Sequence, residues 1–133
     1  MFDTKVAIMV LEDLAVWQKL NVTAFLATGI AGAAPEAMGE PYEDAEGTMR
    51  LLGQPIMILA AKPEILARAR RQALERGLIC AAYVRAMFDT GHDAANREVF
   101  QASPIDAMDL VGFAVRGPRK DVDKAVKGAK LHS

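Results

Sequence analysis

The amino-acid sequence predicts a three-layer α/β/α sandwich built around a four-stranded mixed sheet. Four short apolar segments, residues 6–11, 55–60, 78–84 and 108–115, have the composition of strands that are covered on both faces. Segments with helical spacing or helical end signals separate the first three strands and follow the last one. Because 52% of the residues are hydrophobic, the whole chain, residues 1–133, has enough apolar material for one domain with a single core.

The first strand is followed by a helix that we predict from Trp17 to about residue 33. Apolar residues recur there at helical spacing in two stripes. A helix that is apolar over so much of its circumference is expected to be largely buried. Its later half contains small residues that would let it lie close to a sheet, namely Ala27, Gly29, Ala31, Gly32 and Ala33.

The remaining elements are less uniform. Residues 36–48 contain acidic residues, glycines and a proline but no basic residue, which predicts an acidic surface loop. A second helix begins at Pro63 and has Gly77 as its C-cap, and a final short helix begins at Pro118. Residues 85–107 are the least regular part of the chain, where we expect a loop or short edge structure.

Helical crossovers predict that at least the first three strands are parallel. In open sheets of this kind, ligands bind beyond the carboxyl ends of the strands. We therefore expect a site among residues 12–21 and 85–92, which follow the first and third strands.

Four segments carry a resemblance to a known family. They are KVAIMVLEDL at residues 5–14, LLGQPIMILAA at 51–61, LERGLICAAYV at 74–84 and DLVGFAVRGPRKDVDKAVKGAKL at 109–131. Together with Lys19 in the turn after the first segment, they resemble the archaeal and eukaryotic type of peptidyl-tRNA hydrolase. The resemblance implies a fold like that of the type II peptidyl-tRNA hydrolases and a homodimer.

The helix after Lys19 lacks the glutamine and histidine that this family carries, and the closest match to its later Asp-Ala-Gly-Arg-Thr-Gln stretch is Asp89–Gly91. The chain therefore looks like a member of an uncharacterised bacterial family of unknown function that shares the hydrolase fold. Two functions follow from this resemblance. One is a hydrolase with its site at the N-terminus of the first helix; the other is a non-catalytic small-ligand-binding or protein-interaction domain that has lost the hydrolase residues.

As a hydrolase, the chain has three candidate catalytic residues. Lys19 would stabilise a developing oxyanion, and Asp89 or Thr90 would handle a proton or a water molecule. The candidate substrate-binding residues are Asn21, Thr23, Arg85 and His92.

The same residues also have structural interpretations. Asn21 would cap the first helix, Lys19 would be solvated, and Thr23 would bond to the backbone within the first turn. The Asp-Thr-Gly sequence at residues 89–91 would form a turn.

Composition limits the partners. The two histidines lie far apart and Cys80 lies in an apolar strand, so we expect no metal, and the absence of glycine-rich phosphate motifs predicts no cofactor. Residues 116–130 contain six basic and two acidic residues. Such a segment would either bind RNA phosphates or form an ordinary solvated helix surface. We expect a small-molecule or tRNA-linked substrate and a homodimer.

Neither a membrane nor DNA is an expected partner. The longest uncharged stretch, Leu20 to Pro35, is shorter than the roughly 20 apolar residues that cross a bilayer, and the net charge is -1. The chain shows no export signal, and the single cysteine has no internal disulfide partner. These observations predict a cytoplasmic protein.

Overall fold

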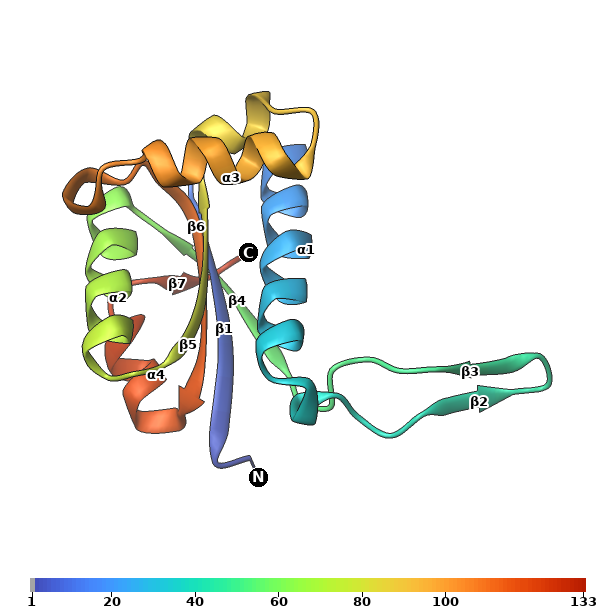
Figure 1. Cartoon of the computed structure of the whole chain (residues 1–133). Helices are drawn as coiled ribbons and strands as arrows, with labels where there is room; N and C mark the ends of the chain where they lie inside the picture. Colours follow the sequence, from blue (N-terminus) through green and yellow to red (C-terminus); the bar gives the residue numbers. More distant parts are fainter. Residues whose placement is uncertain (1) are drawn as a thin grey trace.

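The computed structural model describes residues 2–133, which form a mixed sheet between two layers of helices (Figure 1). From one edge to the other, its five strands are β5 (Ile79–Val84), β6 (Leu110–Pro118), β1 (Thr4–Leu11), β4 (Ile56–Ala61) and β7 (Lys130–Leu131). β1, β4 and β5 point in the same direction, whereas β6 runs antiparallel to β1 and β5, and β7 runs antiparallel to β4. The common direction of the first three predicted strands is confirmed.

The predicted number of four strands is wrong, because it left out β7. The final helix, α4 (Arg119–Ala125), is short as predicted and has Pro118 as its N-cap. Gly128 follows it with φ +98°, in the left-handed region that favours glycine. The chain therefore turns back after α4, and its last residues add a short strand along β4.

The helices cover both faces of the sheet. α1 (Val16–Ala33) lies on one face, and α2 (Pro63–Glu75) and α4 lie on the other (Figure 1). The predicted three layers are thus present. α3 (Asp93–Ala102) lies across the end of the sheet where β1 and β5 finish (Figure 1). Within residues 2–133, no helix combines the length and the hydropathy needed to span a bilayer.

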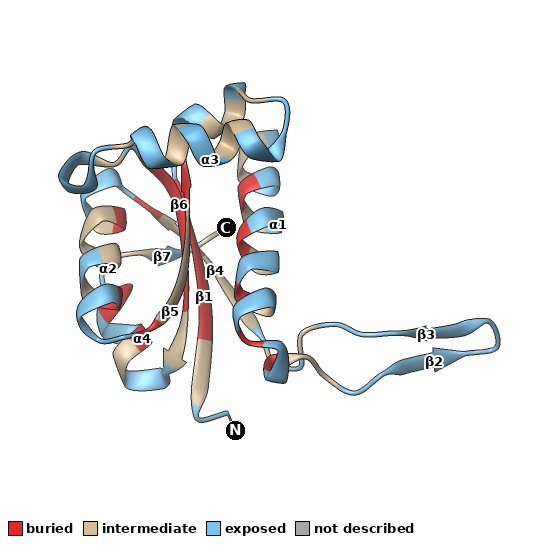
Figure 2. Cartoon of the chain, in the orientation of Figure 1, coloured by how far each residue is buried: buried red, intermediate tan, exposed pale blue. Residues whose placement is uncertain are grey.

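The core lies along the two central strands. Residues 6–11 of β1 and 110–115 of β6 are all buried, which confirms the prediction of strands covered on both faces (Figure 2). α1 adds Val22, Leu26 and Ile30, which lie four residues apart and therefore form one stripe along the helix.

The expectation that α1 is largely buried is wrong. Trp17, Leu20 and Phe25 are 60%, 67% and 55% exposed. The sheet contacts only one stripe of the helix. Trp17 and Phe25 lie beside the rings of Phe88 and Tyr83, and the rest of the opposite side faces away from the body (Figure 2).

Within the acidic segment, residues 40–48 are exposed as predicted, but Ala37 is buried, and part of the segment is a hairpin rather than a loop. β2 (Tyr42–Asp44) and β3 (Gly47–Met49) pair antiparallel and project from the body near the C-terminal end of α1 (Figure 1). At the tip, Asp44 Oδ1 accepts hydrogen bonds from the backbone N–H groups of Glu46 at 2.8 Å and Gly47 at 3.1 Å. We call residues 40–51, all of which are exposed, the arm.

The prediction for residues 85–107 is also wrong in part. A 3₁₀ turn, Arg85–Asp89, leads into α3, which is a regular helix of ten residues. His92 is the N-cap of this helix, because its Nδ1 accepts a hydrogen bond from the backbone N–H of Ala95 at 3.2 Å.

Candidate functional site

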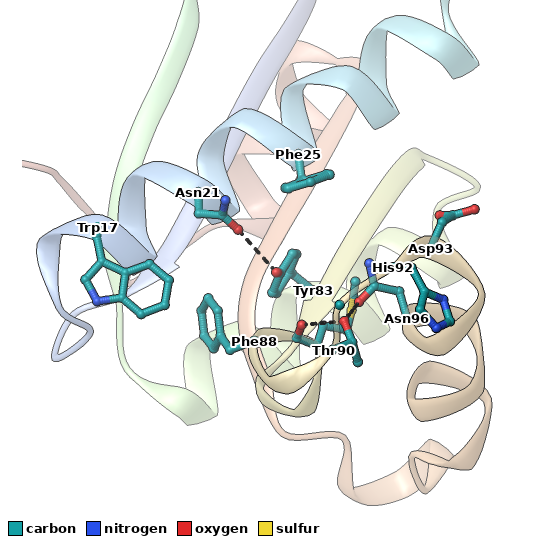
Figure 3. Close-up of a pocket in the computed structure, with 11 residues that line it drawn as sticks. Trp17, Asn21, Phe25, Tyr83, Phe88, Thr90, His92, Asp93 and Asn96 are labelled. Atoms are coloured by element: carbon teal, nitrogen blue, oxygen red, sulfur yellow. Dashed lines mark hydrogen bonds between the residues drawn. The ribbon is translucent and has the colours of Figure 1, made fainter.

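A cavity of about 420 Å³ lies between the first half of α1 and the segment that follows β5 (Figure 3). It is at the carboxyl end of β5, on the side of the sheet where the sequence predicts a site. The lining residues come from α1, β5, the turn after β5 and the start of α3: Trp17, Asn21, Phe25, Tyr83, Met87, Phe88, Thr90, Gly91, His92, Asp93 and Asn96.

Four aromatic rings form a continuous chain along the cavity. The ring centroids of Trp17 and Phe88 are 5.7 Å apart, those of Phe88 and Tyr83 are 5.2 Å apart, and those of Tyr83 and Phe25 are 6.2 Å apart. Edge-on and tilted pairs at these distances are favourable because the positive edge of one ring meets the negative face of the next. The rings therefore support one another and present a large apolar surface.

Asn21 lies between Trp17 and Phe25 in the second turn of α1 and is hydrogen-bonded to Tyr83 (Figure 3). The Tyr83 hydroxyl donates to Asn21 Oδ1 at 3.3 Å (Figure 3). Tyr83 is buried, and this burial raises the pKa of its hydroxyl, which keeps the hydroxyl protonated and able to donate. The carboxamide of Asn21 is thus oriented with its N–H₂ group left to donate to a ligand.

Thr90 and Asn96 form a second polar group. Thr90 Oγ1 donates to the backbone carbonyl of Met87 at 2.9 Å and also contacts the carboxamide of Asn96. The hydroxyl has one hydrogen, which lies between two acceptors, the carbonyl oxygen of Met87 and Oδ1 of Asn96, so the N–H₂ group of Asn96 stays free. These bonds involve neither a carboxylate nor an imidazole, so they hold Thr90 in place without activating it as a nucleophile.

His92 and Asp93 lie where the cavity meets α3. The N-cap bond uses Nδ1 of His92 as an acceptor, so the neutral ring carries its proton on Nε2 and can donate from there. The Asp93 carboxylate pairs with Arg97 at 2.5 Å, one turn later in α3. The acidic charge beside the cavity is therefore already matched by a cation.

The structure brings three of the seven predicted site residues together: Asn21, Thr90 and His92. Lys19 does not line the cavity; its Nζ is 3.1 Å from His132 Nε2. Asp89 is exposed at the end of the 3₁₀ turn and does not line the cavity either.

The other two predicted residues have structural contacts. Thr23 Oγ1 donates to the backbone carbonyl of Lys19 at 2.7 Å, which is the bond within the helix that the structural interpretation expects. Arg85 forms an ion pair with Asp109 at 3.0 Å. The expectation that Asn21 caps α1 is wrong, because the helix begins at Val16 and its N-cap is Ala15.

Sequence reasoning missed the aromatic residues of the cavity. A signal was present on α1, where Trp17, Asn21 and Phe25 lie four residues apart and so share a face. Their partners Tyr83 and Phe88 flank the end of the third predicted strand, but nothing local in the sequence indicates that the two segments meet.

Among residues 2–133, no group of three or more histidine, cysteine, aspartate or glutamate side chains is placed to hold a metal ion. The only cysteine, Cys80, lies in β5, away from the residues that line the cavity. The hydrogen-bonding side chains of the cavity include carboxamides, hydroxyls and an imidazole, which suit hydrogen bonding to an organic ligand.

Comparison with known proteins identifies the family. A family model described as a protein of unknown function (DUF2000) matches residues 4–133. The chain belongs to the DUF2000 family. A solved structure of a protein of unknown function, Atu0240 from Agrobacterium tumefaciens strain C58, is similar to this DUF2000 chain, with 50% identity, a TM-score of 0.93 and coverage of 100% of each chain. A search of curated proteins gave no match to this DUF2000 chain.

Proposed function

We propose that this DUF2000 protein is a small-ligand-binding domain whose cavity takes a flat aromatic or heterocyclic molecule with a polar edge. The observation that carries the proposal is the chain of four aromatic rings that shares one cavity with the carboxamides of Asn21 and Asn96. Rings offer stacking surfaces, and each carboxamide keeps its N–H₂ group and one lone pair of its oxygen for a ligand, because its Oδ1 already accepts from Tyr83 or Thr90. A ligand with one apolar face and an edge that carries hydrogen-bond donors and acceptors would contact both the rings and the carboxamides.

Size and charge narrow the ligand further. About 420 Å³ falls in the range of small-molecule sites. The cavity is lined by no lysine or arginine, and the carboxylate of Asp93 is paired with Arg97. A phosphorylated ligand would find no counter-ion in the lining, so an uncharged compound fits better.

The hydrolase remains the alternative function, and the resemblance to peptidyl-tRNA hydrolases supports it. The short sequences that carry the resemblance fall at the starts or ends of strands: Gly53–Pro55 precedes β4, Gly77–Leu78 precedes β5, and Gly117–Pro118 closes β6. This agreement supports a type II peptidyl-tRNA hydrolase-like fold. A tRNA-linked substrate has less support, because Lys19 and Asp89 lie outside the cavity.

The cellular setting belongs to the same proposal. Cys80 is a free thiol in β5, and a protein with one unpaired cysteine suits a reducing compartment. We therefore propose a cytoplasmic ligand-binding protein.

Trp17 provides the test, since it is the only tryptophan in the chain and lines the cavity. We would titrate benzamide, nicotinamide and adenine against the intrinsic fluorescence of Trp17. Cyclohexanecarboxamide, which has the carboxamide of benzamide without its aromatic ring, is the ligand control. We expect a saturable change with at least one flat probe and none with the saturated analogue.

The variants localise the binding. Phe88→Leu should weaken binding of the flat probe about threefold to tenfold, because it removes the central ring of the aromatic chain. Phe2→Leu is the matched control, because Phe2 is exposed and lines a different cavity. Equal binding of benzamide and its saturated analogue, or no saturable change with any probe, would contradict the proposal.

Hydrolysis of a blocked aminoacyl-tRNA distinguishes the alternative. The ligand-binding proposal expects no turnover by the wild-type protein. Turnover that disappears in Lys19→Ala would instead support the hydrolase.

A further inference from the structure

We propose that the arm of each chain lies against a second copy of the same chain, beside the N-terminal half of that copy's α1, so that two chains form a symmetric dimer in which each arm closes the partner's cavity. The evidence for the dimer itself comes from the arm and from α1. The closing of a ligand cavity additionally rests on the proposed function.

The arm is fixed at its base, but beyond the base it is not covered by any other part of residues 2–133. Gly39 N–H donates to the carbonyl of Leu51 at 2.8 Å, and Gly53 N–H donates to the carbonyl of Ala37 at 2.8 Å. A Cβ on Gly53 would lie only 2.9 Å from the Cα of Gly39, so the two chain segments are in close contact there. Beyond this base, residues 40–51 are all exposed and point away from the body (Figure 1).

An isolated two-stranded hairpin is at best marginally stable in water. This one also carries apolar side chains on one face. Tyr42 and Met49 are directly paired across the two strands and are 58% and 55% exposed, and Leu51, two residues after Met49, is 52% exposed. A hairpin with these properties is expected to be covered by another surface.

The outer side of α1 is a surface of the same kind. The only charged residue among the 18 of this helix is Lys19, and its ammonium group contacts His132. The exposed side chains therefore carry no charge, and they include Val16, Trp17, Leu20 and Phe25. A helix face in contact with water normally carries charged residues, so this face is typical of an interface.

The positions of the two surfaces select a second copy as the partner. The arm leaves from the C-terminal end of α1 on the side of the helix that faces away from the sheet (Figure 1). When two α1 helices pack antiparallel about a twofold axis near Ala24, each arm meets the N-terminal end of the partner's helix. Each chain then both offers and receives an arm, which is the self-complementarity that a twofold interface requires.

The dimensions and the area agree with this arrangement. The uncharged side of α1 is a strip about 27 Å long and about 10 Å wide. This strip alone is smaller than the roughly 800 Å² per partner of a stable interface. Each side of the arm, residues 40–45 and 46–51, extends about 17 Å, enough to pass Trp17 and the mouth of the partner's cavity.

Oligomeric state is the first measurement. Light scattering of the full chain should give the mass of a dimer. Leu20→Glu places a charge on the outer face of α1 and should give a monomer. Leu74→Glu is the matched control, because Leu74 is 54% exposed on α2, on the opposite face of the sheet, and should leave the dimer intact.

Cross-linking between two different chains tests the arm directly. In a Cys80→Ser background, one preparation carries Met49→Cys and a second carries Leu20→Cys; when mixed and oxidised, they should form a mixed disulfide dimer. A mixture of Phe2→Cys with Leu20→Cys should not. Replacing residues 41–50 by two glycines should also give a monomer, with the fold confirmed by circular dichroism.

The outcomes are distinct. A monomeric wild type, or a dimer that survives both Leu20→Glu and removal of the arm, would overturn the proposal. A dimer with the expected cross-link that binds no flat probe would keep this inference and reject the proposed function. Binding of benzamide by a monomeric wild type would reject the dimer and keep the proposed function. Weaker benzamide binding, about threefold or more, after removal of the arm would support closing of the cavity by the partner.

Discussion

Cys80 shows how the surroundings of one side chain affect the stability of the protein. The thiol lies in β5, and burial raises its pKa above the ordinary value of 9.0, although the nearby Arg70 lowers it in part. Folding therefore favours the protonated thiol. As the pH rises past 9.0, the unfolded chain loses this proton first, and the free energy of unfolding falls.

We expect Cys80→Ala to reduce this alkaline loss of stability. The measurement is the urea midpoint of both proteins at neutral pH and just above pH 9.0. The wild type should lose more stability between the two conditions than the variant. An equal loss would mean that the thiol titrates alike in the folded and unfolded chains.

The candidate site shows what the sequence could indicate about single residues. Asn21, Thr90 and His92 were selected because they follow the ends of predicted strands, and they do line one cavity. Lys19 was selected by resemblance, but its side chain turns toward His132, 113 residues later in the chain. Contacts over such separations depend on the complete fold and leave no local pattern.

At the scale of elements, β6 and α1 depend on a close approach at Gly112. A Cβ at this position would lie 2.3 Å from Val22 Cγ1 and 3.0 Å from Leu26 Cδ1, both on α1. The absence of a side chain on β6 therefore lets the buried stripe of α1 reach the sheet.

Gly112→Ala should lower the free energy of unfolding by about 1–3 kcal/mol, because α1 would have to move away from the sheet. Gly91→Ala serves as the control, because a Cβ at Gly91 would have no atom within 4 Å. Urea unfolding of the two variants gives the comparison. Equal stabilities would show that Val22 moves aside without cost.

The elements that were predicted correctly share one property. β1, β4, β5 and β6 are apolar runs, which gives them a clear signal; β1 and β6 are buried on both faces, and β4 and β5 are mostly half-buried. The arm strands and β7 are only two or three residues long and mix polar with exposed apolar side chains, so they carry no strand pattern of their own. α3 has no fully buried residue, and apolar side chains such as Phe100 are only half-buried, so its short sequence looks irregular although one side of the helix is more apolar than the other.

At the scale of the whole molecule, the C-terminal tail protects one edge of the sheet. β7 pairs with the edge of β4, and His132 N–H donates to the carbonyl of Ile58 at 2.9 Å. Unpaired strand edges are sites where other chains can add.

A chain that stops after Ala129 should lose about 1–3 kcal/mol of stability and should form larger assemblies, because the edge of β4 would be open. His132→Ala is the control, since it keeps the backbone pairing and removes only the side-chain contacts with Lys19 and with the backbone oxygen of Ser133. Urea unfolding and light scattering measure the two effects. A truncated chain as stable and as uniform in mass as the wild type would show that β7 does not protect the sheet.

The place of β6 in the sheet also has a consequence for synthesis. β6 is the last long strand to leave the ribosome, yet it lies between β1 and β5 and is the only strand that β5 pairs with. A nascent chain that ends before residue 110 can pair β1 with β4, but β5 has no neighbour, because β6, the strand between β5 and β1, has not yet been made. We therefore expect the domain to fold only after nearly the entire chain has been released, with the half-made sheet dependent on chaperones until then.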